Sequence, residues 1–526
     1  MLLPGMKAFN KNVLSVQDFL GYNHNLVIED NEFYHTQNIT TDYYPVMTQR
    51  SPRGTIRKIT KPNGFYAKEV LYWVDGTDLY KDGELIGQVE DSRKQFASMG
   101  AYLLIFPDKL IYNTQDGTLT SMENATEFTG TVKLEMANLS DSTQNTTEYS
   151  TFVKISAAGI GVGFKQYDGV EISGLPQEDL NKTAILQEVA DDYVLIIGEV
   201  EETTETKCTV KLERKTPDME YFTESMNRLW GCSSKNHEIY SCKLGDPTNW
   251  YAYEGISTDS YAVTIGSDGD FTGACTYLGY VLFFKENTIH KIMGNKPSNY
   301  EVMETKGRGV EKGSERSPVI VNETLYYKAR TGIVAYQGAS ATSISEAFGN
   351  VKYTNAVAGV YGNKYYVSMM DGEQYSLFCY DETKGIWCRE DDTEILFIAN
   401  LNNMMYYIDA SGNMKAIEGD DEEVIEWEAI SGNIFVSGKR KYVGRMSIRV
   451  DLEKYSFIEI WISYNNDDLW EMVKTITAAK NRSYDIPVRP KRCDHFRIKM
   501  RGVGRCRVYA LEKTIEIGSA TNVRFK

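Results

Sequence analysis

The feature that most constrains this chain is a hairpin pattern that recurs along it: an apolar, aromatic strand, a short polar turn, and a second alternating strand. Its first instance is KEVLYWVDGTDLYKDGELIGQV from Lys68, where two Asp-Gly dipeptides supply the positive φ angles that tight hairpin turns need. Aromatic rings pack well on pleated sheets, and 36 Tyr, 20 Phe and 42 Gly suit many short strands joined by glycine turns. The sequence therefore predicts an all-β protein. The pattern recurs at Ala101, Asn227, Gly279, Glu323, Asn363 and Asn403.

The spacing of these hairpins indicates a β-propeller. Four of the spacings are about 40–50 residues, which is the length of a four-stranded blade. About six such units fit between Ile56 and Gly419. No Trp-Asp signature stands at a fixed place in the repeats, so an array of sandwiches remains an alternative. The predicted fold is an irregular β-propeller with an inserted small β-domain and a C-terminal antiparallel β-sandwich.

Changes in residue pattern and in hairpin spacing divide the chain into segments. Residues 1–55 have no helical period, and the stretch between the second and third hairpins is too long for a blade connection. The only helix candidate is Asp218–Met226, which Pro217 could open. The predicted segments are an extended N-terminal arm (1–55), a propeller body (56–120 and 220–430), an inserted β-barrel or sandwich (121–219) and the C-terminal β-sandwich (431–526), with alternating strands at Arg445–Val450, Phe457–Tyr464 and Phe496–Arg501.

Charge is distributed unevenly between these segments. The net charge is −16, which argues against a nucleic-acid reader because such proteins carry basic patches. Residues 439–526 hold 20 Lys/Arg and 10 Asp/Glu, a balance of +10, which leaves −26 for residues 1–438. Opposite charges of this kind predict contacts between neighbouring copies or an oppositely charged partner; two unrelated domain surfaces explain them equally well. The acidic runs Glu199–Glu205 and Asp420–Glu423 are interpreted as solvated faces.

The sequence holds no constellation typical of an enzyme. It lacks a P-loop, a Gly-x-Ser-x-Gly elbow, a His-Glu-x-x-His motif and a Cys-x-x-Cys pair, and its five histidines stand alone. Turns at Ser267–Gly269 and Asp409–Gly412 only loosely resemble the boxes of propeller glycosidases. We therefore predict neither catalysis, metal nor cofactor. Trp230, Trp250 and Trp427 are interpreted as core rather than as sugar-binding faces.

Targeting signals are equally scarce. The first twelve residues lack the apolar run of a signal peptide, and no stretch reaches the ~18 apolar residues of a spanning helix. We therefore expect the protein to be made and kept in a cytosol, or released by lysis, with no membrane span. The eight cysteines follow no metal spacing and are expected to be reduced, buried thiols.

Three segments resemble a known family. DNEFYHTQNITTDYYPVMTQRSPRG is similar to the opening of bacteriophage tail stabilisation, or tail hub, proteins, in which Tyr-Pro-x-x-x-x-Arg leads into the first blade. NRLWGCSSKNHEIYSCKLGDPTNWY resembles their Arg-Leu-Trp … Ile-Tyr … Gly-Asp-Pro-x-x-Trp turn, and RCDHFRIKMRGVGRCRVYALE resembles their last domain. The matching positions are Asn38, Asp42, Tyr43, Tyr44, Pro45, Arg50 and Arg53 in the first segment, and Asn227, Arg228, Leu229, Trp230, Ile239, Tyr240, Gly245, Asp246, Pro247 and Trp250 in the second.

The resemblance implies a virion protein of the phage tail: a hub or nozzle, with a hexameric ring of copies below the portal or adaptor, and with DNA passing through without specific binding. A passage for a polyanion should present carboxylates, which suits the acidic body. The alternatives are a tail-tip propeller that binds a receptor or carbohydrate and, with least support, a propeller glycosidase or lyase. The residues expected at the assembly interface are Tyr43, Tyr44, Pro45, Arg50, Arg53, Arg440, Lys441, Arg489, Lys491 and Arg492.

Overall fold

The structure, a computed structural model, describes residues 11–139, 151–422, 424–435, 441–465, 469–477, 480–488 and 493–517. It divides into two compact units. Unit 1 comprises residues 1–60 and 316–526, and unit 2 comprises residues 61–315. In the described residues the only helices are 3-10 turns of three residues each: η2 (Glu178–Leu180), η3 (Pro297–Asn299) and η4 (Glu346–Phe348).

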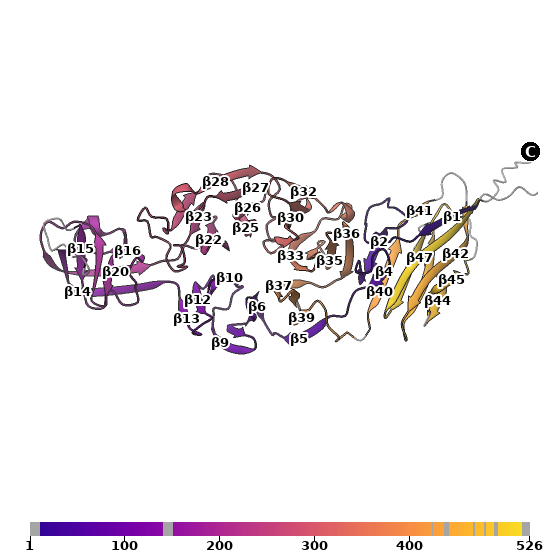
Figure 1. Cartoon of the computed structure of the whole chain (residues 1–526), viewed down its shortest axis with the longest axis horizontal. Helices are drawn as coiled ribbons and strands as arrows, with labels where there is room; N and C mark the ends of the chain where they lie inside the picture. The colour runs from indigo at the N-terminus through magenta and orange to yellow at the C-terminus, as the bar shows by residue number, and fades with distance from the viewer. Residues whose placement is uncertain are drawn as a thin grey trace, which may run out of the picture. The chain divides into compact units, whose positions relative to one another are not determined.

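Unit 2 holds four antiparallel sheets of four strands each, drawn in Figure 1. In each sheet consecutive strands are neighbours, so every sheet is a meander of hairpins. The first strands of these sheets contact one another in the order β6, β10, β21, β25, as in propeller blades. The strands are β6 (Pro62–Ala67), β7 (Leu71–Asp75), β8 (Asp78–Lys81) and β9 (Glu84–Gln88); β10 (Gln95–Met99), β11 (Tyr102–Phe106), β12 (Leu110–Asn113) and β13 (Leu119–Ser121); β21 (Tyr221–Ser225), β22 (Arg228–Ser233), β23 (Glu238–Ser241) and β24 (Tyr261–Thr264); β25 (Phe271–Tyr277), β26 (Tyr280–Lys285), β27 (Thr288–Met293) and β28 (Glu301–Lys306).

Unit 2 also contains a small barrel between the second and third of these sheets. Its strand order is β17-β16-β20-β14-β15-β19-β18. The two outermost strands of that order, β17 and β18, follow each other in sequence, and the Gln187 amide between them donates to the Leu195 carbonyl at 2.8 Å. The sheet therefore closes on itself around an apolar core that includes Val132, Val153 and Leu212. The strands are β14 (Asn124–Ala137), β15 (Phe152–Ser156), β16 (Gly169–Ser173), β17 (Thr183–Ile185), β18 (Glu188–Ala190), β19 (Tyr193–Ile197) and β20 (Thr204–Arg214).

Unit 1 holds three more four-stranded sheets, of which the last is completed from the other end of the chain. There β5 pairs with β39, with Lys58 opposite Asn413. The first strands again contact one another, β29 with β33 and β33 with β37. The strands are β29 (Val319–Val321), β30 (Thr324–Ala329), β31 (Gly332–Tyr336) and β32 (Ala341–Ser343); β33 (Thr354–Tyr361), β34 (Lys364–Met370), β35 (Tyr375–Asp381) and β36 (Ile386–Asp391); β37 (Ile395–Leu401), β38 (Met404–Asp409), β39 (Asn413–Ala416) and β5 (Gly54–Lys58).

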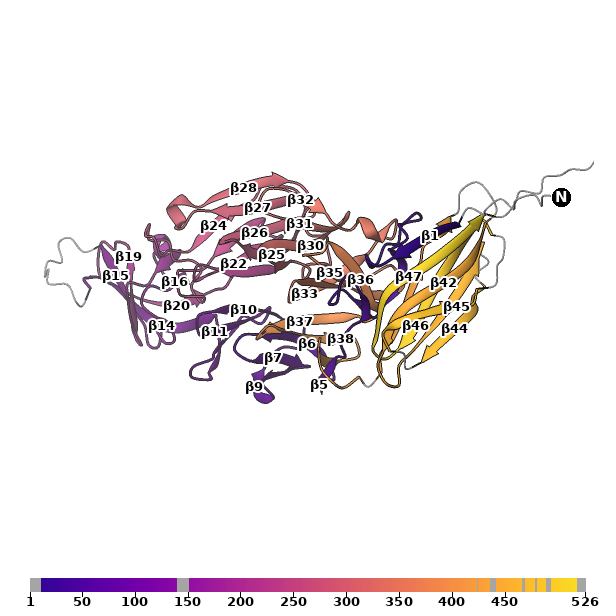
Figure 2. The ribbon, with the colours of Figure 1, turned by 45° about the vertical axis from the view of Figure 1, so that its right-hand side comes forward.

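The C-terminal part of unit 1 is a sandwich of two six-stranded antiparallel sheets, and the segment predicted as an N-terminal arm supplies four of its strands. Strand β1 pairs with β47, as Figure 2 shows beside the yellow C-terminal strands, and β2 pairs with β40. Along each strand of the sandwich, every second side chain points into the core between the two sheets. Ile448, Ile460 and Ile498 are among these core side chains. One sheet comprises β1 (Lys11–Val16), β3 (Ile39–Thr40), β4 (Met47–Gln49), β42 (Lys441–Leu452), β45 (Arg482–Ile486) and β47 (Cys506–Ile517); the other comprises β2 (Phe33–Gln37), β40 (Glu426–Ser431), β41 (Ile434–Phe435), β43 (Phe457–Tyr464), β44 (Glu471–Thr477) and β46 (His495–Val503).

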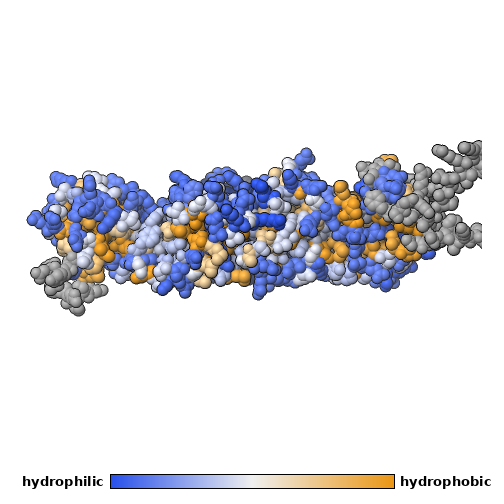
Figure 3. All heavy atoms as spheres, turned by 90° about the horizontal axis from the view of Figure 1, so that it is seen from above, coloured by the Kyte–Doolittle hydropathy of each residue, from blue (hydrophilic) through white to orange (hydrophobic). Residues whose placement is uncertain are grey.

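These observations confirm the predicted all-β, propeller-like class and change two details. The described residues form seven four-stranded sheets rather than about six units, one for each of the seven hairpins, and β5 completes the last sheet. The helix predicted at Asp218–Met226 is wrong: Tyr221–Ser225 is strand β21, since its aromatic and Thr side chains suit a pleated sheet. Trp230, Trp250 and Trp427 are 3%, 1% and 2% exposed, which confirms them as core. On the face seen in Figure 3, hydrophobic residues form separate patches among hydrophilic ones.

Searching the described residues for a helix long and apolar enough to cross a membrane finds none.

Candidate functional site

The most elaborate polar site of unit 1 is formed by residues 38–53, which we call the N-terminal clamp. Its β3–β4 hairpin joins the sandwich, while its backbone also bonds to the propeller sheets of the same unit. The Asn38 amide donates to the Glu390 carbonyl at 2.6 Å, and the Asn38 side chain donates to the Glu426 carbonyl at 2.8 Å. The Gly419 amide donates to the Pro52 carbonyl at 2.8 Å. One short segment therefore ties β36, β40 and the end of β39 together.

Two buried arginines anchor the clamp. The Arg53 guanidinium lies 2.7 Å from the Glu390 carboxylate and 2.6 Å from that of Asp391. The side chains of Arg53 and Glu390 are both only 3% exposed. Arg50 lies 2.6 Å from a carboxylate oxygen of Glu422 and donates through Nε to Asn38 at 2.8 Å. Paired charges of this kind are tolerated inside a protein because each has a partner with hydrogen-bonding geometry.

The cluster shifts the titration of its carboxylates. Burial alone would raise the pKa of Asp391, but Arg53, Arg50 and hydrogen bonds from Thr393 outweigh it and hold that pKa below its usual value. Glu422 behaves in the same way, because Arg50 outweighs its burial. Both carboxylates therefore stay charged well below neutral pH, so the cluster is a fixed ionic joint rather than a proton donor.

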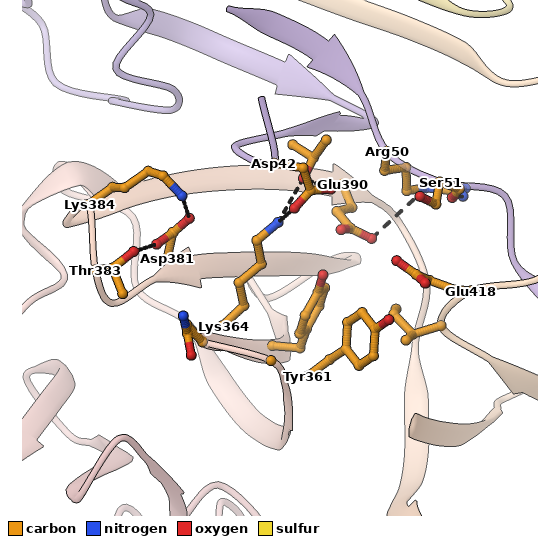
Figure 4. A pocket seen from close by; sticks show the side chains of 15 residues that line it. Asp42, Arg50, Ser51, Tyr361, Lys364, Asp381, Thr383, Lys384, Glu390 and Glu418 are labelled. Carbon is orange, nitrogen blue, oxygen red and sulfur yellow. Dashed lines mark hydrogen bonds and ion pairs between the residues drawn. The ribbon is translucent and has the colours of Figure 1, made fainter. Parts of the chain in front are cut away.

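Beside the cluster lies a cavity of about 220 Å³, shown in Figure 4. Lys364 reaches across it to the Asp42 carboxylate and donates to the Thr40 hydroxyl at 2.8 Å. Asp381 accepts from the Thr41 hydroxyl at 2.6 Å and lies 2.6 Å from the Lys384 ammonium. The cavity is lined by Thr40, Asp42, Arg50, Ser51, Tyr361, Gly362, Asn363, Lys364, Tyr366, Asp381, Thr383, Lys384, Glu390, Ile417 and Glu418.

The pKa shifts of two groups in this cavity favour their charged forms. Although burial opposes its charge, the pKa of Lys364 is raised by its neighbours, Asp42 among them. The pKa of Asp381 is lowered, because Lys384, Thr41 and Thr383 outweigh its burial. A glycosidase needs one carboxyl group whose pKa is raised so that it can protonate a leaving group. The pKa of Asp381 is shifted the other way, and its ion pair with Lys384 suits holding strands together.

The residues predicted at the assembly interface fall into three groups. Tyr43 and Tyr44 are exposed, at 54% and 38%, and the Arg507 guanidinium lies 4.9 Å from the Tyr43 ring centre. Pro45 follows Tyr44, and its carbonyl accepts from the Phe19 amide at 3.2 Å. Arg50 and Arg53 are occupied by the chain's own carboxylates. Lys441 begins β42, and its side chain is not described; Arg440, Arg489, Lys491 and Arg492 lie outside the described residues. Their role in assembly stays a prediction.

Sequence reasoning missed the acidic partners of the clamp. Glu390 and Asp391 lie more than three hundred residues from Arg53, and no local pattern links them. Glu422 belongs to a run interpreted as a solvated face, yet it pairs with Arg50 and is 31% exposed. The only sequence feature that pointed to this site was the pair Arg50 and Arg53, which follows a Tyr-Pro step in a segment that otherwise has little charge.

The second resembling segment forms a rigid turn in unit 2. Arg228 is 1% exposed and donates to the carbonyls of Cys242 and Ser257 at 2.8 and 2.9 Å. The Trp250 indole donates to the Pro247 carbonyl at 2.8 Å. Gly245 has φ +77° and closes the turn through its amide. These hydrogen bonds therefore give the residues a structural role in the blade.

A second set of carboxylates near a hollow lies in unit 2. A cavity of about 750 Å³ is lined by Asp116, Glu123 and Asp246 among others. Asp116 and Asp246 each accept from the threonine two residues later, and Glu123 lies 2.9 Å from the Lys109 ammonium. Hydrogen bonds within its own turn lower the pKa of Asp116. Within the part of the chain that the structure describes, no group of three or more His, Cys, Asp or Glu could hold a metal ion.

Comparison with known proteins defines no family for the chain. No family model and no curated protein matches it. Among solved structures it is similar to BamB from Moraxella catarrhalis, with 10% identity, a TM-score of 0.36, and coverage of 71% of this chain and 99% of that one.

Two further solved structures are similar over part of the chain. An exo-β-1,3-galactanase from Phanerochaete chrysosporium has 9% identity, a TM-score of 0.22, and coverage of 54% and 92%, respectively. BBS1N in complex with ARL6DN has 10% identity, a TM-score of 0.25, and coverage of 70% and 96%. Likenesses this distant carry no argument about function.

Proposed function

We propose that the chain is a structural subunit of a bacteriophage tail, a hub or nozzle protein whose copies form a ring around the DNA ejection channel and join the portal or adaptor to distal tail parts. The observation that carries the proposal is the N-terminal clamp. The motif residues Arg50 and Arg53, which resemble those of tail hub proteins, form a buried ionic joint between β36 and the start of the sandwich. Such a joint holds distant segments of the chain together, as a structural subunit requires.

The distribution of carboxylates also bears on the path of DNA. Within each unit the first strands of neighbouring four-stranded sheets contact one another, and among these described first strands only β21 carries an acid, Glu224. An acidic wall that repels DNA phosphates would therefore be built from the outer surfaces of several copies, to which the −26 balance of residues 1–438 contributes. Head-to-tail contacts between identical copies close into a ring when their rotation closes.

The competing functions find less support. A carbohydrate-binding tail tip would stack sugars on exposed aromatic faces, and the three tryptophans considered for that role, Trp230, Trp250 and Trp427, are buried. Binding of the purified chain to host cell walls would support the carbohydrate-binding function instead. A glycosidase needs a carboxyl group with a raised pKa, whereas Asp116 and Asp381, each lining a hollow, have lowered pKa values.

The proposal is tested by the state of the purified chain. Light scattering should give a mass several times 59.7 kDa, and negative-stain images should show rings or ring fragments. Particles released by lysis of the host should contain the chain in a few copies. A chain that is strictly monomeric and absent from particles contradicts the proposal.

A further inference from the structure

The outer face of one sandwich sheet carries a row of cations along β46. Phe496, Ile498 and Met500 are buried in the sandwich core. Because side chains alternate along a strand, Arg497, Lys499 and Arg501 point to the opposite face, about 7 Å apart. Three cations in a row on a sheet face repel one another, so something must hold them in place.

Two tryptophans hold two of these cations, Lys499 and Arg497. Trp461 lies directly opposite Lys499 on β43, and its ring centre is 5.6 Å from the Lys499 ammonium. The same ammonium lies 4.7 Å from the Trp470 ring centre, and the Arg497 guanidinium lies 5.3 Å from it. Cations over indole faces are attracted by the ring quadrupole, which fixes long side chains that are otherwise mobile. These side chains are therefore already ordered, so less side-chain entropy is lost when a partner binds.

Apolar side chains continue this face. Met472 stands opposite Trp461 on β44 and is 53% exposed, and Leu469, next to Trp470, is 74% exposed. Tryptophan, methionine and arginine are the residue types enriched where proteins meet. We call Trp461, Trp470, Met472, Arg497 and Lys499 the cationic–aromatic face.

The chemistry of the face discriminates between partners. The indole faces are covered by cations, so they do not offer the bare rings on which sugars stack. Carboxylates stand beside the row, with Glu428 3.9 Å from Lys499 and Glu426 2.9 Å from Arg501. These carboxylates would repel the phosphates of a nucleic acid. A protein surface of mixed charge with an excess of carboxylates could still bind, because its own cations can face Glu426 and Glu428.

We propose that the cationic–aromatic face docks on the acidic surface of a second copy of this chain. The occupant follows from charge complementarity: residues 439–526 carry +10, and residues 1–438 carry −26. A contact between different patches of identical copies is the heterologous kind that generates rings. The inference rests on the proposed tail function and names the surface through which its ring would assemble.

Charge reversal tests the inference. Lys499→Glu should raise the dissociation constant of the assembly at least about tenfold, because a fixed cation becomes an anion that faces carboxylates. Met472→Glu should do the same at an exposed position where it cannot disturb the core. Lys312→Glu is the matched control, since Lys312 is 73% exposed in unit 2 and forms a surface pair with Asp270. Mass photometry over a dilution series measures the assembly, and urea unfolding checks that each variant is folded.

The outcomes separate the inference from the proposed function. Dissociation of both face variants with an intact Lys312→Glu control supports the inference. Variants that assemble like the wild type refute it, whether or not they are lost from particles, because loss from particles alone assigns the face to another tail protein. A wild-type chain that stays monomeric and is absent from particles refutes the proposed function and the inference together.

Discussion

Removing the charge of Arg53 should destabilise unit 1 strongly at neutral pH. Arg53→Met keeps much of the length and apolar stem of the side chain but deletes the guanidinium that pairs with Glu390 and Asp391 at 2.7 and 2.6 Å. Arg50 stays in place, with nitrogens 3.9 and 3.7 Å from these carboxylates, too far to replace the lost hydrogen bonds. The variant therefore leaves two carboxylates in the joint with too few partners.

The magnitude follows from burial. Breaking a buried ion pair by removing one partner costs about 3–5 kcal/mol, because the remaining charge is left without compensation. The effect should depend on pH. The lowered pKa of Asp391 contributes stability above the pKa of its unfolded state, about 4, and that stability is lost as the pH falls through the folded value. In the variant this contribution is gone, so the difference from wild type should be largest at pH 7 and should shrink near pH 3.

The assay is urea unfolding at several pH values, followed by the intrinsic fluorescence of the seven tryptophans, four of which lie in unit 1. The matched control is Arg445→Met, which breaks an Arg–Asp pair of the same 2.7 Å length whose side chains are 69% and 68% exposed. Exposed pairs add little to stability, so this control should unfold like the wild type. A loss in Arg53→Met no larger than in the control, or one that does not shrink at low pH, would refute the view of the clamp as a buried ionic joint.

Three further predictions test other parts of the molecule. Lys94→Met should lower the free energy of unfolding of unit 2 by about 3–5 kcal/mol in urea titrations, because Lys94 and Asp108 form a pair whose side chains are 0% and 3% exposed. Burial lowers the pKa of His35 to about 4, so wild-type stability should fall by up to roughly 3 kcal/mol as the pH drops from 6.5 to 4, and His35→Phe should lose this dependence in the same titration. Gly412→Ala should destabilise the pairing of β5 with β39 by more than about 1 kcal/mol, because the φ angle of Gly412 is +82° and an added Cβ would lie 2.1 Å from the Ile59 carbonyl oxygen. Faster hydrogen exchange of the β5 amides would show this loss.

Local elements could be predicted from the sequence because their signals are local. Strand β43 spans Phe457–Tyr464, the range that alternation predicted. The error at Tyr221–Ser225 came from reading Pro217 as a helix start, although the following residues favour a strand.

Pairings between distant segments could not be predicted in this way. Strand β5 completes a sheet whose other strands lie more than three hundred residues away, and nothing in its own sequence names β39 as its partner. The same holds for β1, which pairs with β47. The resemblance drew attention to Arg50 and Arg53, but only the structure shows that their partners are the chain's own carboxylates.

The central claim is that this chain works as one of several copies around a passage for DNA. Electron cryo-microscopy of intact phage particles that contain the chain tests it most directly. The account predicts a ring of copies at the tail, with propeller-like densities around an axial opening wide enough for duplex DNA. Particles in which the chain occurs as a single copy away from the tail axis, or in which no ring encloses the passage, would contradict it.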